Sequence, residues 1–276
     1  MQIGIFTKTF ERPTLEACLD AVRQYELEAV QLNLESAGGE PMPDEISDEL
    51  CERIRTGLAD RGIALTAVSG TFNIIHPDPR EQSAGMRRLE VLASACAGMG
   101  ASLITMSTGT RDPDYMWRRH ADNDTPAAWR DMLEAMGQAV RIAEDNDVTL
   151  VFEPEVSNVV DSAQKARRLL DEMGSDHLKV VLDGANLFHE GELPRMREIL
   201  DEAFDLLGED IRMAHGKDLE RDGEAGFLAA GTGVLDYDHY LALLQGIGFA
   251  GGLILHSLEE GQVEESLSFV RGRLAP

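Results

Sequence analysis

Strand-like and helix-like segments alternate along the whole sequence, and this alternation limits the folds open to it. Short apolar runs are each followed by a segment in which apolar residues recur at helical spacing. The strand-like runs are IGIF (3–6), AVQLNL (29–34), IALTAVSG (63–70), SLITMST (102–108), VTLVFEP (148–154), LKVVLD (178–183), IRMAHG (211–216) and GGLILH (251–256). The chain therefore repeats one strand-then-helix unit eight times.

Eight such units predict a closed barrel of parallel strands that is covered by helices. The length of 276 residues is close to the roughly 250 residues that are typical of a (β/α)8 barrel. An open sheet of about five or six strands is hard to fit to all of these units. We therefore predict an α/β protein with a single (β/α)8 TIM barrel, which forms one domain over residues 1–276.

The composition argues against several classes of protein. The 50 acidic and 25 basic residues give a formal net charge of −25, which repels nucleic acids and anionic membranes. No apolar run approaches the roughly 20 residues of a membrane helix, and residues 1–10 lead directly into a strand without a signal peptide. Cys18, Cys51 and Cys96 lie far apart in apolar segments, which predicts core residues rather than a disulfide or metal motif. We expect a cytoplasmic protein that binds neither nucleic acid nor membrane.

Polar residues stand where the predicted strands end, and in a barrel of this type those positions carry the chemistry. They are Lys8, Asn33, Glu35, Asn73, His76, Arg111, Glu153, Asp183, His215, Lys217, Asp218 and His256. Glu153, Asp183 and His215 end three consecutive strands and are expected to converge at the barrel mouth. Each alone is better explained as a helix cap, a salt bridge or a hydrogen-bonded histidine. Together they predict a site for Mn²⁺, Mg²⁺, Co²⁺ or Zn²⁺.

These strand ends resemble those of the xylose isomerase-like TIM barrels, which include sugar phosphate isomerases and epimerases and AP endonuclease family 2. The resemblance covers nearly the whole chain and rests on FEPE (152–155), LDGANLF (182–188), HGKD (215–218) and GGLILH (251–256). The ketose epimerases of this family bind one divalent metal ion through a glutamate, an aspartate, a histidine and a second glutamate. The resemblance implies the first three roles for Glu153, Asp183 and His215, and it places His256 at the fourth position.

The histidine at the fourth position affects the mechanism as well as the metal site, because both glutamates of those epimerases also act as acid and base. His256 can complete the metal site as a neutral ligand or transfer a proton, but it cannot do both at once. If it is a ligand, another side chain must transfer protons. The candidates are Lys217, Glu155, His76 and His189, while Glu259 and Glu260 offer a carboxylate from the following loop.

Several residues near the strand ends are predicted to bind substrate. Glu155 lies on the same face of an extended segment as Glu153, about 7 Å away, and can bind hydroxyl groups or orient Asn158. In the loop after residue 107, a sugar ring can stack on Trp117 while Arg111 binds a hydroxyl group or an anion. The predicted substrate-binding residues are His76, Arg111, Trp117, Asn186 and His189.

The predicted site favours an enzyme of the sugar isomerase or epimerase type. A divalent metal ion, with Mn²⁺ as the first choice, polarises the substrate, and a base such as Glu153 removes a proton to give an enediolate-like intermediate. If a β-hydroxyl then leaves, the enzyme is instead a dehydratase or other lyase that acts on a keto-sugar or keto-inositol. A Schiff-base lyase that uses Lys8 or Lys217 and a non-catalytic sugar-binding barrel with a degenerate metal site stay open.

The expected partner is a small sugar molecule. An endonuclease is disfavoured by the net charge of −25 and by Asn186, because the endonuclease IV branch has a histidine three residues after the aspartate. The outer helices leave a homo-oligomer open, and no segment of the sequence identifies its interface.

Overall fold

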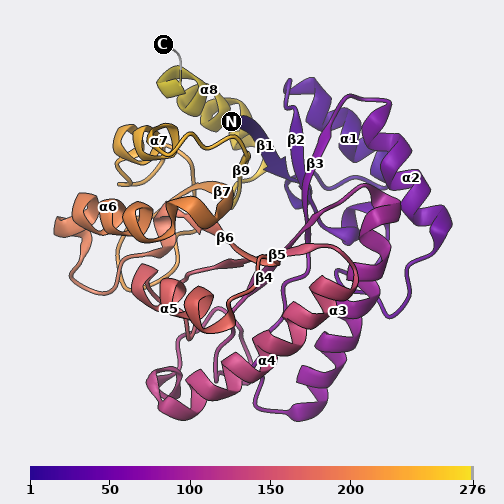
Figure 1. Ribbon diagram of the computed structural model, residues 1–276. Helices are drawn as coiled ribbons and strands as arrows, with labels where there is room; N and C mark the ends of the chain where they lie inside the picture. The colour runs from indigo at the N-terminus through magenta and orange to yellow at the C-terminus, as the bar shows by residue number, and fades with distance from the viewer. Residues whose placement is uncertain (275–276) are drawn as a thin grey trace.

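Parallel strands close into a barrel, as the repeated units predict (Figure 1). The computed structural model describes residues 1–274. Within them, the barrel strands are β1 (Gln2–Phe6), β2 (Ala29–Leu32), β3 (Ala64–Ser69), β4 (Leu103–Ser107), β5 (Thr149–Glu153), β6 (Leu178–Asp183), β7 (Ile211–Asp218) and β9 (Gly252–Leu255). Each pairs in parallel with both of its neighbours, and the pairing of β9 with β1 completes the ring. The predicted (β/α)8 barrel is confirmed.

The helices form an outer layer around the strands (Figure 1). They are α1 (Leu15–Gln24), α2 (Asp48–Ala59), α3 (Pro79–Met99), α4 (Pro126–Asp145), α5 (Ala163–Met173), α6 (Met196–Leu207), α7 (Tyr237–Gly246) and α8 (Val263–Leu274). Most begin with a side-chain oxygen that accepts a hydrogen bond from a free main-chain N–H group of the first turn. These capping residues are Thr14, Ser47, Asp78, Thr125, Ser162 and Asp236.

Short 3-10 helices lie mainly in the connections. They are η1 (Thr7–Thr9), η2 (Leu34–Ala37), η3 (Ala121–Asp124), η4 (Gly184–Asn186), η5 (Leu193–Arg195), η6 (Gly208–Asp210) and η7 (Glu260–Gln262). Two of them begin at barrel strands, because Asn33 and Asp183 each accept a hydrogen bond from the main-chain N–H two residues later. This local turn ends β2 two residues earlier than its apolar run predicts.

One additional strand was not predicted from the sequence. β8 (Leu228–Ala229) pairs antiparallel with the end of β7, where Lys217 lies opposite Ala229 and Asp218 opposite Leu228. This pairing extends β7 past the barrel rim to Asp218. The segment that follows His215 is therefore held as a hairpin above the barrel mouth.

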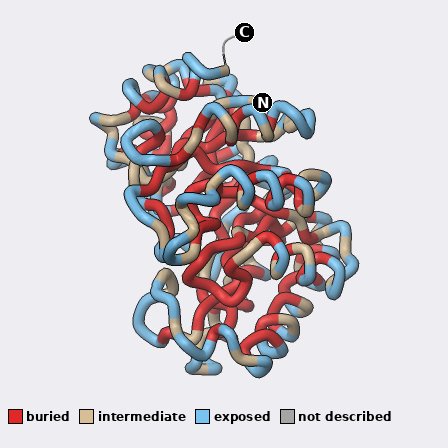
Figure 2. The backbone as a smooth tube through the Cα atoms, turned by 90° about the vertical axis from the view of Figure 1, so that its left-hand side faces the viewer, coloured by how far each residue is buried: buried red, intermediate tan, exposed pale blue. Residues whose placement is uncertain are grey.

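The core has two parts. The larger lies between the helices and the outer face of the strands, and Figure 2 shows this buried interior in red beneath exposed outer turns. The smaller fills the barrel itself with Ala67, Val151, Val181, Met213 and Ile254. A barrel filled by side chains leaves its C-terminal mouth as the place where a ligand can bind.

The cysteines are buried and unpaired, as their apolar surroundings predict. Burial raises the pKa of Cys18 to about 11 and the pKa of Cys96 to about 12, so both thiols stay protonated at neutral pH. Within residues 1–274, no helix is both long enough and apolar enough to cross a membrane.

Candidate metal centre

Three predicted metal ligands come together at the C-terminal end of the barrel. Glu153 ends β5, Asp183 ends β6, and His215 in β7 lies opposite Asp183 in the register of the two strands. One ligand atom from each residue lies within 4.8 Å of the others. His215 Nδ1 is 3.5 Å from Asp183 Oδ2 and 3.6 Å from Glu153 Oε1.

The donor atoms of this cluster fit a divalent metal ion. Among the described residues, Asp183 Oδ2 and His215 Nδ1 are buried side-chain atoms that have no hydrogen-bond partner. Lys217 Nζ lies 3.1 Å from Asp183 Oδ2 as an ion pair, but it lacks hydrogen-bond geometry. An unsatisfied buried polar group costs about 1–3 kcal/mol. A cation bound by two carboxylates and an imidazole would satisfy both atoms.

A buried glutamine on β2 orients the histidine of this cluster. His215 Nε2 lies 3.0 Å from Gln31 Oε1, and Gln31 Nε2 donates to Thr105 Oγ1 at 3.3 Å. Because Gln31 uses its amide nitrogen on Thr105, its oxygen faces the imidazole and accepts the proton of Nε2. Nδ1 is then the nitrogen that faces the carboxylates. Metal-bound histidines usually show the same division, with one ring nitrogen hydrogen-bonded to the protein and the other free to bind the metal. Gln31 was not among the site residues predicted from the sequence, although a polar residue inside the apolar run AVQL is a usable signal.

The charged residues of the cluster shift the pKa values of one another. Burial lowers the pKa of His215, but Glu153 and Asp183 outweigh this effect and raise it to about 9. Burial raises the pKa of Asp183, but Lys217 and His215 outweigh this effect and hold the pKa of this carboxyl below its ordinary range. Burial also lowers the pKa of Lys217, whereas Asp183 and Glu153 bring it above its ordinary value. A metal ion would therefore replace the extra proton on His215 when it binds.

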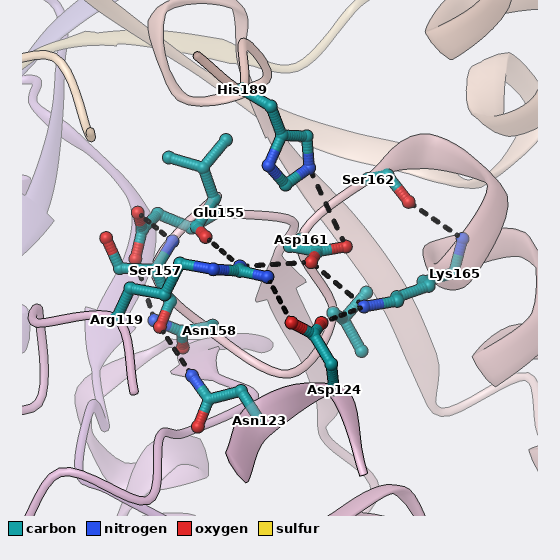
Figure 3. Close-up of polar contacts among 12 residues, drawn as sticks. Arg119, Asn123, Asp124, Glu155, Ser157, Asn158, Asp161, Ser162, Lys165 and His189 are labelled. Carbon is teal, nitrogen blue, oxygen red and sulfur yellow. Dashed lines mark hydrogen bonds and ion pairs between the residues drawn. The ribbon is translucent and has the colours of Figure 1, made fainter. Parts of the chain in front are cut away.

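Glu155 is buried beside the cluster and held in place from two sides. Its Oε1 accepts from Ser157 N at 2.8 Å, and its Oε2 accepts from Asn158 Nδ2 at 2.7 Å (Figure 3). The predicted contact between Glu155 and Asn158 is thus present. Burial raises the pKa of Glu155 to about 7. This carboxyl can therefore give or take a proton near neutral pH.

Asn186 positions Glu153. Its Nδ2 donates to Glu153 Oε1, while its Oδ1 accepts from Gly226 N at 3.0 Å. Both ends of the amide are used by the protein, although the side chain also lines the cavity described below. The predicted contact of Asn186 with substrate stays a prediction, and the contact with Glu153 is an added role.

His256 lies next to the cluster but does not join it. Its ring stacks on Phe6 with centroids 5.1 Å apart, and its centroid is 4.9 Å from that of His215. Nδ1 lies 2.8 Å from Ser257 Oγ. Burial and the positive charges of His215 and Lys217 lower the pKa of His256 well below its ordinary value, so the ring is neutral. The role of His256 as ligand or proton carrier stays a prediction.

The cluster opens into a cavity of about 370 Å³ at the barrel mouth. Several predicted site residues share its wall. They are Trp117, Glu153, Glu155, Asn186, His215, Lys217 and His256. The cavity lies within the range of about 300–1,000 Å³ that is usual for small-molecule sites.

Other predicted residues lie elsewhere. Arg111 pairs with Asp131 on α4, His76 Nε2 lies 3.1 Å from Pro113 O beside a neighbouring cavity, and His189 lines a separate cavity of about 160 Å³. Within residues 1–274, the wall of the main cavity includes none of these three, nor Glu259 or Glu260. Glu260 instead pairs with Arg12 at 2.6 Å. Substrate contacts of these side chains stay predictions.

Fold and site together define a (β/α)8 barrel with a carboxylate–histidine cluster that could hold a metal ion at the ends of its strands. The chain belongs to the xylose isomerase-like TIM barrel family, whose family model matches residues 19–273. It is 25% identical over 238 residues to the ketose 3-epimerase of Arthrobacter globiformis, a match that covers 84% of this chain and 76% of that protein.

Two solved structures are similar in fold. One is the IOLI protein with a bound zinc atom, at a TM-score of 0.73 and 17% identity, with 99% of this chain and 96% of that chain covered. The other is the probable 3-DHS dehydratase AsbF of Bacillus anthracis, which is involved in petrobactin synthesis. Its TM-score is 0.74 at 13% identity, with 100% of this chain and 99% of that chain covered. At these identities, the likeness shows the shared fold.

Proposed function

We propose that this protein is a divalent-metal-dependent isomerase or epimerase that acts on a sugar or related polyol. The observation that carries the proposal is the cluster of Glu153, Asp183 and His215 beside a cavity of about 370 Å³, with two buried atoms that have no hydrogen-bond partner among the described residues. The similarity to a ketose 3-epimerase supports the class of reaction.

The cluster would hold one metal ion, for which we propose Mn²⁺, with Mg²⁺, Co²⁺ and Zn²⁺ as alternatives. Glu153, Asp183 and His215 are the ligands, and His256 is the candidate for a fourth. When bound, a divalent ion would polarise a carbonyl and a neighbouring hydroxyl of the substrate. The zinc atom in the IOLI structure supports a divalent ion in a barrel of this fold.

Side chains of this protein would move the proton. A carboxylate, Glu153 or Glu155, takes it from the carbon next to the carbonyl. The C–H electron pair forms a carbon–carbon double bond while the carbonyl π pair moves onto its oxygen, which gives an enediolate-like intermediate. Lys217 stays an ammonium ion, since the neighbouring carboxylates raise its pKa, and it can donate to the oxygen that gains charge. A protonated lysine disfavours the Schiff-base alternative, because that chemistry needs a neutral amine.

Exchange of substrate hydrogen with solvent tests the proposal. The protein with Mn²⁺ is incubated with a panel of ketoses in deuterated water, and NMR follows deuterium at the carbons beside the carbonyl. We expect exchange with at least one sugar, and loss of exchange in Asp183→Asn. No exchange with any sugar, combined with no bound metal after Mn²⁺ loading, would instead support the non-catalytic barrel.

A dehydratase is the second candidate. The observation that favours it is His256, which stands where the epimerases of this family have their second catalytic glutamate, and the fold match to a probable dehydratase is consistent with it. The first step is the same, but a β-hydroxyl then leaves as water. Mass spectrometry of the product distinguishes the two, because only a dehydratase gives a product that has lost one water.

A further inference from the structure

Two aromatic side chains stand exposed at the mouth of the main cavity. Tyr115 is 49% exposed and Phe227 is 56% exposed, and they are two of the four large apolar side chains that are exposed within residues 1–274. Both line the cavity, together with Trp117. Exposed apolar side chains that gather around a pocket mark a surface that a ligand covers.

Phe227 is presented by a fixed strand. It directly precedes β8, whose Leu228 lies opposite Asp218. The carboxylate of Asp218 also accepts main-chain hydrogen bonds from Gly231 at 3.1 Å and from Leu235 at 2.9 Å. On the other side of Phe227, Gly226 N donates to Asn186 Oδ1 at 3.0 Å, so the backbone is fixed both before and after Phe227.

Tyr115 is held by its own loop, which follows β4. Its main-chain N–H donates to Asp112 Oδ1 at 2.8 Å, and its carbonyl accepts from Arg118 N at 3.0 Å. The guanidinium of Arg118 lies 5.9 Å from the centre of the Tyr115 ring. The turn therefore fixes the backbone that carries the ring.

A network of ion pairs ties this loop to the loop after β5 (Figure 3). Arg119 Nη1 donates to Val156 O at 2.7 Å and to Asp161 Oδ2 at 3.1 Å, and Nη2 donates to Asp124 Oδ2 at 2.7 Å. Asp161 is buried and also pairs with Lys165 at 2.9 Å. The loop that carries Tyr115 is thus anchored to the loop after β5.

The charges around the cavity do not suit a phosphate group. Its described lining includes no arginine, and its lysines are Lys8 and Lys217. Lys217 pairs with Asp183 at 3.1 Å, and Lys8 lies 3.5 Å from Glu35. Phosphate sites in proteins usually offer arginine side chains or helix N-termini. A neutral ligand fits this wall better than a phosphorylated one.

We propose that the substrate is an unphosphorylated keto-sugar that carries an aromatic substituent, as in an aryl glycoside whose sugar ring bears a ketone. The sugar lies at the Glu153, Asp183 and His215 cluster, and its substituent packs against Tyr115 and Phe227 at the rim. This inference rests on the proposed function, since it assumes that the sugar binds at the metal centre.

Binding of matched glycosides tests it. Calorimetry of the Mn²⁺-loaded protein compares phenyl with methyl glycosides of glucose, galactose and mannose, and with glucose 6-phosphate. An aromatic contact of this kind changes affinity by about two- to tenfold, so a phenyl glycoside should bind tighter by that factor. Phe227→Ala and Tyr115→Ala should each reduce the preference. Val234→Ala is the control, because Val234 is 53% exposed but lies outside the cavity lining.

Several results would overturn the inference. They are equal binding of phenyl and methyl glycosides, binding of neither, tighter binding of the phosphate, or a phenyl preference that persists in both alanine variants. The hydrogen-exchange experiment separates this failure from that of the proposed function. Exchange with free ketoses but no phenyl preference rejects the aromatic substituent alone, whereas a phenyl preference without exchange or elimination rejects the reaction alone.

Discussion

Removal of the side-chain carbonyl of Gln31 should weaken metal binding while the fold stays intact. Gln31 is 3% exposed and accepts the His215 Nε2 proton at 3.0 Å. In Gln31→Leu, this buried N–H loses its acceptor, which costs about 1–3 kcal/mol. The imidazole can avoid that cost by moving its proton to Nδ1, but Nδ1 is the nitrogen that must bind the metal.

The expected magnitude follows from this competition. Outer partners of metal-bound histidines are typically worth about 10–100-fold in metal affinity. We therefore expect the dissociation constant for Mn²⁺ or Zn²⁺ to rise by that factor in Gln31→Leu, or about 1.4–2.8 kcal/mol. This range agrees with the cost of one unsatisfied buried N–H group, so a single lost hydrogen bond accounts for the whole effect.

Competition with a chromophoric chelator measures the affinity, and urea unfolding of the apoprotein measures stability. Gln31→Glu keeps an acceptor oxygen and should bind metal more tightly than Gln31→Leu. Ser107→Ala is the matched control, because its buried hydroxyl donates to Phe72 O at 3.1 Å, outside the cluster. If Gln31→Leu binds metal as tightly as the wild type, or if Ser107→Ala loses as much affinity, then Gln31 does not orient His215.

Three further predictions concern the same region. Asp183→Asn should reduce the bound metal, measured by elemental analysis, from about one ion per chain to none, because a buried ligand loses its charge. Full metal occupancy in this variant would exclude Asp183 as a ligand. Metal affinity should rise with pH up to about 9, because His215, whose pKa is raised to about 9, must release a proton when the metal binds. Calorimetry of metal binding in two buffers at pH 7 measures this proton release, and its absence would contradict the prediction. Tyr240→Phe should lower the free energy of unfolding in urea by about 1–2 kcal/mol. The Tyr240 hydroxyl lies 3.1 Å from the carbonyl oxygens of both Leu182 and His215, and its one proton is shared between these two acceptors. An unchanged free energy of unfolding would refute that role.

The barrel and its carboxylate–histidine cluster could be predicted because both follow from the order of short apolar runs. A strand covered on both faces is usually a near-continuous apolar run, and LKVVLD, with VVL at its centre, coincides with β6 (Leu178–Asp183). The last residues of neighbouring parallel strands then lie side by side, as Asp183 and His215 do in the strand register. No knowledge of side-chain packing was needed for Glu153, Asp183 and His215 to be expected together.

Contacts that depend on long-range packing could not be predicted in this way. Gln31 meets His215 across 184 positions of sequence, and nothing near either residue indicates the partner. Loops are a second case, because polar neighbours compete for their side chains. Arg111 pairs with Asp131 instead of entering the cavity, and the rim position of Phe227 depends on the two-residue strand β8.

The residue that departs from the family pattern, His256, separates the proposed reactions. Glu153 and Glu155 both come from the end of β5 and the loop after it, so they give the cavity carboxylates on one wall. His256, which directly follows β9, presents a neutral imidazole that is stacked on Phe6. An isomerase or a dehydratase can remove and deliver protons from one wall of the cavity. An epimerase must instead return the proton to the opposite face of the substrate carbon from which it was taken. We therefore infer that epimerisation needs a second proton carrier away from Glu153 and Glu155, for which His256 is the first candidate and Lys217 the alternative, and that isomerisation or dehydration does not.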